Sequence, residues 1–293
     1  MIRVQSYSSA VVKSTTTTDH RPCASLLVLI IIFFSSACST GGLETGPAIN
    51  ETEKMKAVHA LLKKINKPAN KTIHSPDGDI IDCVDYHQQP AFDDPLLKAQ
   101  KRPLSQAEWP EGHIKNSLDM ENVQLWSLNG ESCPEGTVPI RRTKEQDILR
   151  APSIAAFGRK MSTKRDSSNE VHEHAVGYVK GDSVYYGAKA GINVWAPHVA
   201  DNSDEFSISQ IWITSSSLDN TIEAGWQVSQ AMYGDTSPRF FIYWTGDSYN
   251  NGCYNLGCSG FVQIGNKYAV GAAITPTSEY NGTQKDIEIY IWK

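Results

Sequence analysis

One acidic side chain stands in the middle of a segment with the alternation of a β-strand, TIEAGWQVS at 221–229. Because side chains alternate between the two faces of a strand, Glu223 shares a face with Gly225 and with small or polar residues. The opposite face is apolar and consists of Ile222, Ala224, Trp226 and Val228. Gly225 has no side chain, so a ligand or another backbone can come close to Glu223. The strand offers a carboxylate suited to acid–base chemistry, although a strand glutamate that points into water is the commoner arrangement.

Other groups of residues that could carry chemistry have less support. His172 and His174 lie two residues apart, as metal ligands on a strand can, but no third ligand follows nearby. An acidic cluster suggests calcium, but its residues do not follow the ligand order of a calcium-binding loop. The cluster consists of Asp77, Asp79, Asp82 and Asp85. Ser259 lies in CSGF rather than in the G-x-S-x-G turn of serine hydrolases, and no phosphate-binding glycine loop occurs. We therefore expect neither a metal nor a cofactor.

The charge of the chain argues against polyanionic partners. Its 293 residues carry a formal net charge of −5 at pH 7, and no basic patch is evident. Nucleic acid and anionic membrane surfaces are therefore not expected partners.

An apolar run at 25–37 is too short to span a bilayer comfortably, and basic residues precede it. Small residues at 36, 37 and 39 follow the run, so residues 1–39 are predicted to be a signal peptide. The protein would then be secreted, to the extracellular space, cell wall or vacuole, without further contact with a membrane. The long lead-in of 24 residues leaves a retained signal anchor as the alternative.

Secretion changes how the cysteines are interpreted, because disulfides persist in oxidising compartments. Four cysteines follow the predicted signal peptide and are disulfide candidates: Cys83, Cys133, Cys253 and Cys258. Three pairings are formally allowed, and proximity favours joining the first to the second and the third to the fourth. Three N-x-[ST] sequons are candidate glycosylation sites, at Asn50, Asn70 and Asn281.

The elements that must position these residues differ between the two halves of the chain. The apolar spacing of ETEKMKAVHALLKKI predicts an amphipathic helix at 51–65 that Asn50 can cap, and a strand is expected at 80–84. Residues 86–135 have an irregular pattern, and the polar stretch GRKMSTKRDSSNE at 158–170 indicates an exposed linker.

Seven strand-like segments follow the expected linker: HEHAVGYVKG, SVYYGAKAGINVWAP, EFSISQIWITS, TIEAGWQVS, RFFIYWTGD, FVQIGNKYAV and KDIEIYIWK. Gly265 and Asn266 would form the turn of a hairpin within the sixth of them. This half of the chain is therefore predicted to be an antiparallel β-sandwich or barrel.

Several long motifs resemble one family in serial order. SPDGDIIDCVDYHQQPAFDDPLLK and CPEGTVPIRRTKEQDILRA are similar to the activation peptide of the plant neprosin family. NVWAP, FSISQIWI, NTIEAGWQV, FFIYWTGD, GCYNLGCSGFVQI and IYIWK are similar to its peptidase domain. The resemblance implies an activation peptide at 40–157, a linker at 158–170 and the N-terminal part of a catalytic domain at 171–293. The implied fold is mainly β, an incomplete antiparallel β-sandwich preceded by a mixed helix and strand region.

The resemblance also implies a function. Neprosin-like proteins are secreted zymogens whose glutamic peptidase domain works at acid pH without a cofactor. The founding enzyme of the family cuts at proline, so a proline preference is expected. Glu223 matches one of the two catalytic glutamates. Such a pair hydrolyses peptides because one carboxylate is ionised and accepts a proton from water, while the other is protonated and donates one. The implied partners are a peptide or protein substrate and the chain's own activation peptide.

The sequence departs from the family pattern after IYIWK, where the family continues with further strands and its second catalytic glutamate. Four other glutamates lie in no motif that matches this second residue: Glu173, Glu205, Glu279 and Glu288. We therefore expect a C-terminally truncated relative, and the sequence leaves its enzymatic activity open. The alternative is a catalytically inactive protein that binds peptides or cell-wall glycans.

Overall fold

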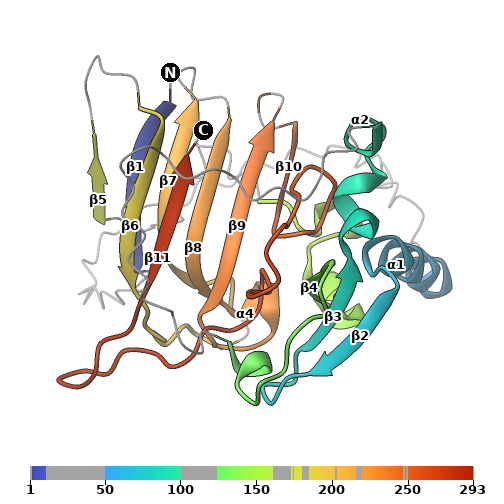
Figure 1. Cartoon of the computed structure of the whole chain (residues 1–293), viewed down its shortest axis with the longest axis horizontal. Coiled ribbons are helices and arrows are strands. Elements are labelled where there is room, and N and C mark those ends of the chain that lie inside the picture. The colour runs from blue at the N-terminus through green and yellow to red at the C-terminus, as the bar shows by residue number, and fades with distance from the viewer. Residues whose placement is uncertain are drawn as a thin grey trace, which may run out of the picture.

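The computed structural model describes residues 2–10, 50–99, 124–160, 173, 175–179, 185–201, 203–215, 220–246, 248 and 250–292. A large β-structure occupies one side of the molecule, and the region 50–157 packs beside it with its own small sheet (Figure 1). Every strand pair within the three sheets is antiparallel. The predicted class, mainly β with antiparallel sheets, is confirmed.

The large β-structure consists of two sheets. Its six-stranded sheet has the order β10 (Asn251–Tyr254), β9 (Arg239–Gly246), β8 (Thr221–Ser229), β7 (Phe206–Ser215), β1 (Ile2–Ala10) and β5 (Ala175–Tyr178). The second sheet pairs β11 (Asp286–Trp292) with β6 (Gly187–Asn193). A short helix, α4 (Gln230–Tyr233), follows β8.

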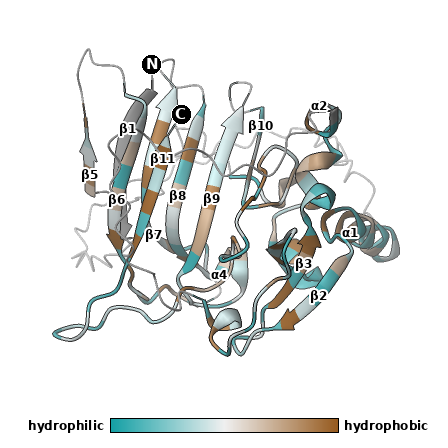
Figure 2. Ribbon diagram, in the orientation of Figure 1, coloured by the Kyte–Doolittle hydropathy of each residue, from teal (hydrophilic) through white to brown (hydrophobic). Residues whose placement is uncertain are grey.

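The two sheets pack face to face over a common apolar core. Ile192 of β6 and Ile287 of β11 belong to one buried cluster with Ile211 of β7 and Trp226 of β8. Hydrophobic positions alternate with polar ones along β11 (Figure 2), so one face of that strand enters the core. Trp226 Nε1 also donates a hydrogen bond to the Asn193 carbonyl at 2.9 Å, which joins the sheets directly. These contacts make the large β-structure a sandwich.

The region 50–157 begins with α1 (Glu51–Ile65), where the Asn50 side chain accepts a hydrogen bond from the Thr52 amide as the predicted cap. A three-stranded sheet follows, in the order β2 (Ala69–His74), β3 (Ile80–Asp85) and β4 (Thr137–Arg141). Two further helices are α2 (Pro95–Ala99) and α3 (Glu145–Arg150). Short 3-10 turns occupy Tyr86–Gln88, Pro90–Asp93, Leu125–Ser127 and Ile154–Ala156.

Both disulfides that proximity favours are present. Cys83 of β3 is bonded to Cys133 inside an apolar cluster, and Cys253 of β10 is bonded to Cys258. The side chains at the three predicted glycosylation sites, Asn50, Asn70 and Asn281, are all exposed. Glycosylation itself stays a prediction.

The predicted hairpin at 261–270 is wrong, because this segment is irregular apart from a single bridge at Val270. Instead, the side chains of two glutamines from the region 50–157 form hydrogen bonds with backbone groups of this segment. Gln89 accepts a hydrogen bond from the Gln263 amide and donates one to the Gln263 carbonyl, each at 2.8 Å. Gln124 makes the same pair of bonds with Ala269, again at 2.8 Å each. Each side-chain amide thus replaces the strand neighbour that a hairpin would have provided.

The first residues of the chain pair with the sandwich. Residues 2–10, within the predicted signal peptide, form β1 between β7 and β5. The apolar run at 25–37 lies outside the described residues. Among the residues that are described, no helix has the length and apolar character that crossing a membrane requires. Signal cleavage stays a prediction, and it would remove β1 from the sheet.

Candidate functional site

Glu223 lies at the centre of β8, and its side chain is fully buried. The strand register places Trp212 of β7 directly opposite it on one side and Tyr243 of β9 on the other. Directly opposed residues of neighbouring strands point to the same face, so these three side chains form a row across the sheet. The apolar face of β8 is buried in the sandwich core except at Ile222, which is 48% exposed rather than buried as its pattern predicts.

Gly225 brings the backbone of β7 close to β8. A Cβ atom at Gly225 would lie 2.0 Å from the Ser209 carbonyl oxygen and 2.6 Å from the Gln210 Cα. Of the two uses predicted for this glycine, the structure shows the approach of another backbone. The glycine therefore fixes the strand spacing immediately beside Glu223.

A lysine from the predicted linker covers Glu223. Lys160 Nζ lies 2.9 Å from Glu223 Oε1 and 3.0 Å from Oε2, so both carboxylate oxygens accept from one ammonium group. The same Nζ lies 5.1 Å from the centroid of the Trp212 ring and 5.0 Å from that of Tyr243. Both separations are within the range of cation–π attraction. The beginning of the expected linker is also fixed at Gly158, whose carbonyl accepts a hydrogen bond from the Tyr254 amide at 2.7 Å.

The row of side chains continues to β10, where Tyr254 is the strand neighbour of Tyr243. The two phenol rings have centroids 4.7 Å apart. Burial raises the pKa of the Tyr254 phenol well above its usual value, and the negative charge of Glu223 raises it further. The phenol therefore stays protonated and keeps a hydroxyl group on the face that carries Glu223.

The other candidate groups do not join this site. No carboxyl group of the described residues is hydrogen-bonded to Glu223. Glu288 belongs to β11 in the second sheet, where its carboxylate pairs with Lys189. Glu205 caps the loop before β7 by accepting from the Ala200 amide, Glu279 is exposed in the loop before β11, and Glu173 is exposed before β5. The described part of the chain contains no group of three potential metal ligands. His172 and His174 lie outside it.

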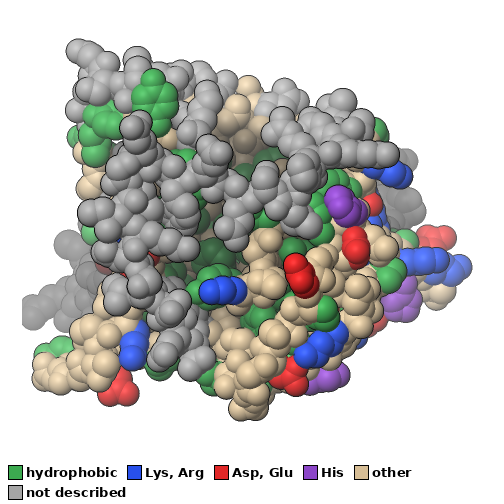
Figure 3. Space-filling model, in the orientation of Figure 1, with side chains coloured by type: hydrophobic (Ala, Val, Ile, Leu, Met, Phe, Trp, Pro, Cys, Tyr) green, Lys and Arg blue, Asp and Glu red, His purple; other side chains and the backbone are tan. Residues whose placement is uncertain are grey.

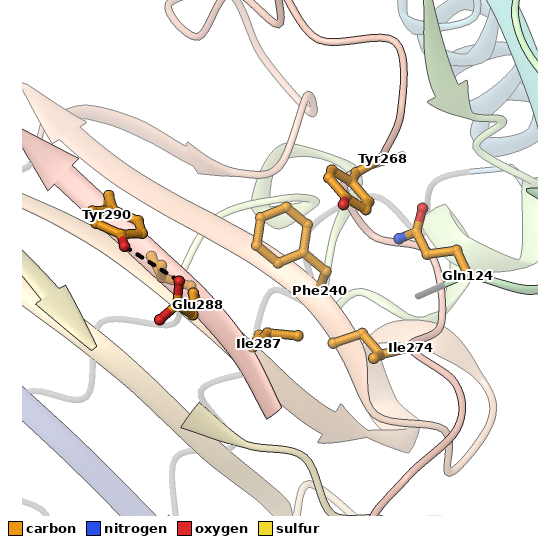
Figure 4. A pocket seen from close by; sticks show the side chains of 8 residues that line it. Gln124, Phe240, Tyr268, Ile274, Ile287, Glu288 and Tyr290 are labelled. Atoms are coloured by element: carbon orange, nitrogen blue, oxygen red, sulfur yellow. Dashed lines mark hydrogen bonds between the residues drawn. The ribbon is translucent and has the colours of Figure 1, made fainter. Parts of the chain in front are cut away.

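A groove of about 200 Å³ lies apart from Glu223, beside the second sheet (Figure 4). Ile274, Ile287 and Phe240 form its apolar wall, and Tyr290 donates a hydrogen bond to Glu288 at its edge. Glu288 at this groove is paired with Lys189 and Tyr290, and Glu223 is not among the residues that line it. The carboxylate on β8 is therefore the better candidate site.

Comparison with known protein families gives two matches in the order that the motifs indicate. Residues 72–178 match the neprosin activation peptide, and residues 203–293 match the neprosin domain. Together they span most of the chain. The chain belongs to the neprosin family. It has the organisation of a neprosin-like precursor, in which an activation peptide precedes the domain that carries Glu223, and Lys160 belongs to the activation-peptide match.

The activation peptide and the neprosin domain are joined by a buried network of charged side chains. Arg239 of the neprosin domain donates to Asp79 Oδ2 at 2.7 Å, and Arg141 of the activation peptide donates to Asp79 Oδ1 at 2.8 Å. Asp235 pairs with Arg239, and Asp147 pairs with Arg141. Arg239 and Asp79 are almost completely buried, so their charges are neutralised by each other rather than by water.

Two aspartates of the acidic cluster seen in the sequence form ion pairs with arginines. Asp79 is held by two arginines, and the Asp82 carboxylate is paired with Arg142. Burial alone would raise the pKa of Asp79, but Arg141 and Arg239 outweigh it and hold the pKa below its ordinary value of 3.8. On the face shown in Figure 3, charged side chains of both signs intermingle over the activation-peptide side of the molecule. The aspartates of this cluster therefore take part in ion pairs and in turn hydrogen bonds.

The sequence indicates Glu223 as a candidate but gives no sign of its neighbours. Trp212 and Tyr243 look like ordinary core aromatics until the strand register is known, because only the register places them beside the carboxylate. Lys160 was assigned to a linker, and its partner is 63 residues away. A lysine at the start of a polar stretch gives no local signal of such a contact.

Proposed function

We propose that this chain is the precursor of a secreted acid endopeptidase in which Glu223 is one of two catalytic carboxylates and proline-containing peptides are the substrates. The observation that carries the proposal is the burial of Glu223 at the centre of the neprosin domain, capped by a side chain of the activation peptide. A strand glutamate more commonly points into water. Here a charged group has been buried and then neutralised by a segment that a protease can remove.

The proposed chemistry is general acid–base hydrolysis. An ionised carboxylate takes a proton from the attacking water, while a protonated partner polarises the scissile carbonyl or protonates the leaving nitrogen. Glu223 supplies one carboxylate, and the second is not assigned among the described residues. The protonated Tyr254 phenol on the same face can donate a hydrogen bond to an oxyanion that forms near Glu223.

Latency follows from the same geometry. While Lys160 donates to both oxygens of Glu223, the carboxylate is a weaker proton acceptor, and the lysine occupies the position where the attacking water would bind. Cleavage within the predicted linker at 158–170, after Lys160, would separate the two parts. Acid would weaken the ion pairs around Asp79 that hold them together. Removal of the activation peptide therefore frees the carboxylate.

The test is the Glu223→Gln variant, assayed on a proline-containing peptide after exposure to acid. We expect the native protein to cleave the peptide and the variant to lose about a hundredfold or more in rate, because loss of one acid–base group costs that much. Glu288→Gln is the matched control, a strand glutamate of the opposite sheet, and it should cleave at the native rate. Undiminished cleavage by Glu223→Gln would overturn the proposal.

Binding without cleavage is the second candidate function. The observation that favours it is that no carboxyl group of the described residues is hydrogen-bonded to Glu223. On this proposal the native protein and Glu223→Gln would both bind peptide or glycan, and neither would cleave it. The same pair of proteins therefore distinguishes the two candidates.

A further inference from the structure

Three side chains around Lys160 form a receptor for a cation. Trp212, Glu223 and Tyr243 stand side by side on β7, β8 and β9, and we call this group the ammonium box. Its floor is a carboxylate with only 1% of its side chain exposed, and its two walls are aromatic rings. The ammonium nitrogen of Lys160 lies about equally far from the two rings, 5.1 and 5.0 Å from their centroids.

The composition of the box selects one chemical class. The two carboxylate oxygens lie 2.9 and 3.0 Å from a single nitrogen, so a compact ammonium satisfies both at once. Ring faces attract a cation, and an alkyl chain packs against them, but neither ring gives a neutral alcohol or a carboxylate a comparable partner. A primary ammonium on an alkyl chain therefore fits the box better than a neutral or anionic group.

The lysine enters the box from an open side. Its side chain keeps 39% of its surface exposed, although the carboxylate beneath it is buried. Lys160 also lies within the activation-peptide match, in the predicted linker at 158–170, rather than in the neprosin domain. The box is thus formed by the domain, and its occupant comes from a part that can leave.

We propose that the ammonium box binds the lysine side chain of a separate peptide once Lys160 is gone. The inference deepens the proposed function, since it names a ligand of the same site. Because a bound ammonium occupies both oxygens of Glu223, such a peptide is an inhibitor of the proposed peptidase rather than a substrate. If the protein binds without cleaving, the lysine peptide is instead its ligand.

The experiment uses the full chain with Lys160→Ala, which empties the box. N-acetyl-lysine-N-methylamide is titrated by calorimetry at neutral pH, with N-acetyl-norleucine-N-methylamide as the neutral analogue of nearly equal shape. We expect saturable binding of the lysine compound to Lys160→Ala. We also expect affinity at least about tenfold weaker for the norleucine compound, the native chain and the double variant Lys160→Ala/Glu223→Gln, a factor equal to 1.4 kcal/mol. Equal affinity in any of these three comparisons would overturn the proposal.

A second measurement needs no emptied site and covers the case in which Lys160→Ala does not fold. Acetylation of individual lysines in the native chain is followed by mass spectrometry, with the exposed Lys267 as the internal reference. Lys160 should react about tenfold more slowly than Lys267 or slower still, because its ammonium is held in the box. In Glu223→Gln the two rates should converge. Equal rates in the native chain would contradict the proposal.

These binding measurements fail independently of the proposed function. Loss of cleavage in Glu223→Gln together with no lysine binding to Lys160→Ala would leave the peptidase proposal standing and remove the ammonium box. Lysine binding to Lys160→Ala together with full cleavage by Glu223→Gln would support the ammonium box and overturn the peptidase proposal.

Discussion

The Asp79 carboxylate of the activation peptide lies 2.7 Å from Arg239 Nη1 of the neprosin domain, and both side chains are buried. The guanidinium also donates to the Gly271 carbonyl at 2.8 Å. A buried pair of this kind holds two parts together in one register, because either charge alone would be costly to bury. The two residues are 160 positions apart in the sequence, and they join the activation peptide to the neprosin domain.

The first prediction concerns the strength of this contact. Asp79→Asn leaves Arg239 and Arg141 with one fewer negative charge in a buried environment, so the free energy of unfolding should fall by about 3 kcal/mol. Glu131→Gln is the control, because its pair with Lys71 is exposed and should contribute less than about 1 kcal/mol. Urea unfolding of both variants measures the difference. Equal losses of unfolding free energy in the two variants would show that the buried pair contributes no more to stability than the exposed one.

The second prediction is a loss of stability in acid. Because the pKa of Asp79 is lower in the folded protein than its ordinary value of 3.8, the ion pairs contribute fully above that value. Their contribution should decrease as the pH falls below about 4 and vanish once the pH is below the folded pKa. The free energy of unfolding, measured from neutral pH to about pH 2.5, should therefore fall more steeply below about pH 4 in the native chain than in Asp79→Asn. Parallel curves would exclude Asp79 as a source of the acid sensitivity.

A nicked form of the protein offers a direct measure of release. After cleavage in the linker, the activation peptide should remain bound at neutral pH and separate under acid, which size-exclusion chromatography can follow. Asp79→Asn should lose its activation peptide at a higher pH than the native protein, because Arg239 has already lost the charge of its partner. Arg141 and the other paired aspartates, Asp147 and Asp235, remain in that variant and set the residual retention.

The fourth prediction tests the close approach of β7 to β8. Gly225→Ala would place a Cβ 2.0 Å from the Ser209 carbonyl oxygen, so one strand must move away from the other. We expect a loss of about 2 to 3 kcal/mol in unfolding free energy. Gly246→Ala, at the end of β9, is the matched control, because its Cβ would meet nothing within 4 Å. Its stability should change by less than about 0.5 kcal/mol, and similar losses in both variants would contradict the explanation.

The elements with strong local patterns could be predicted. The capped helix at 51–65, the strand around Cys83 and the alternating segments that became β7, β8, β9 and β11 all occur where the sequence indicates. Glu223 was recognisable because a carboxylate interrupts an apolar alternation within a family motif. Its burial was not recognisable, because that depends on Lys160 and on neighbouring strands rather than on the residues beside it.

The hairpin at 261–270 shows why the rest could not be predicted. Its sequence has apolar segments on either side of Gly265 and Asn266, which is a sound local signal. The competing partners, Gln89 and Gln124, are 174 and 145 residues away from the backbone groups that they bind. A side-chain amide that replaces a strand leaves no periodicity in the sequence. The outcome was therefore decided by packing of the activation peptide against the neprosin domain.

Through those two glutamines, the proposed release of the activation peptide would also change the structure of the part that remains. When it leaves, the amide and carbonyl of Gln263 and of Ala269 lose four hydrogen bonds in a place where water had been kept out. Solvent must then enter, or the loop must find bonds within itself. The proposed maturation would thus rearrange one margin of the sandwich as well as uncover a carboxylate.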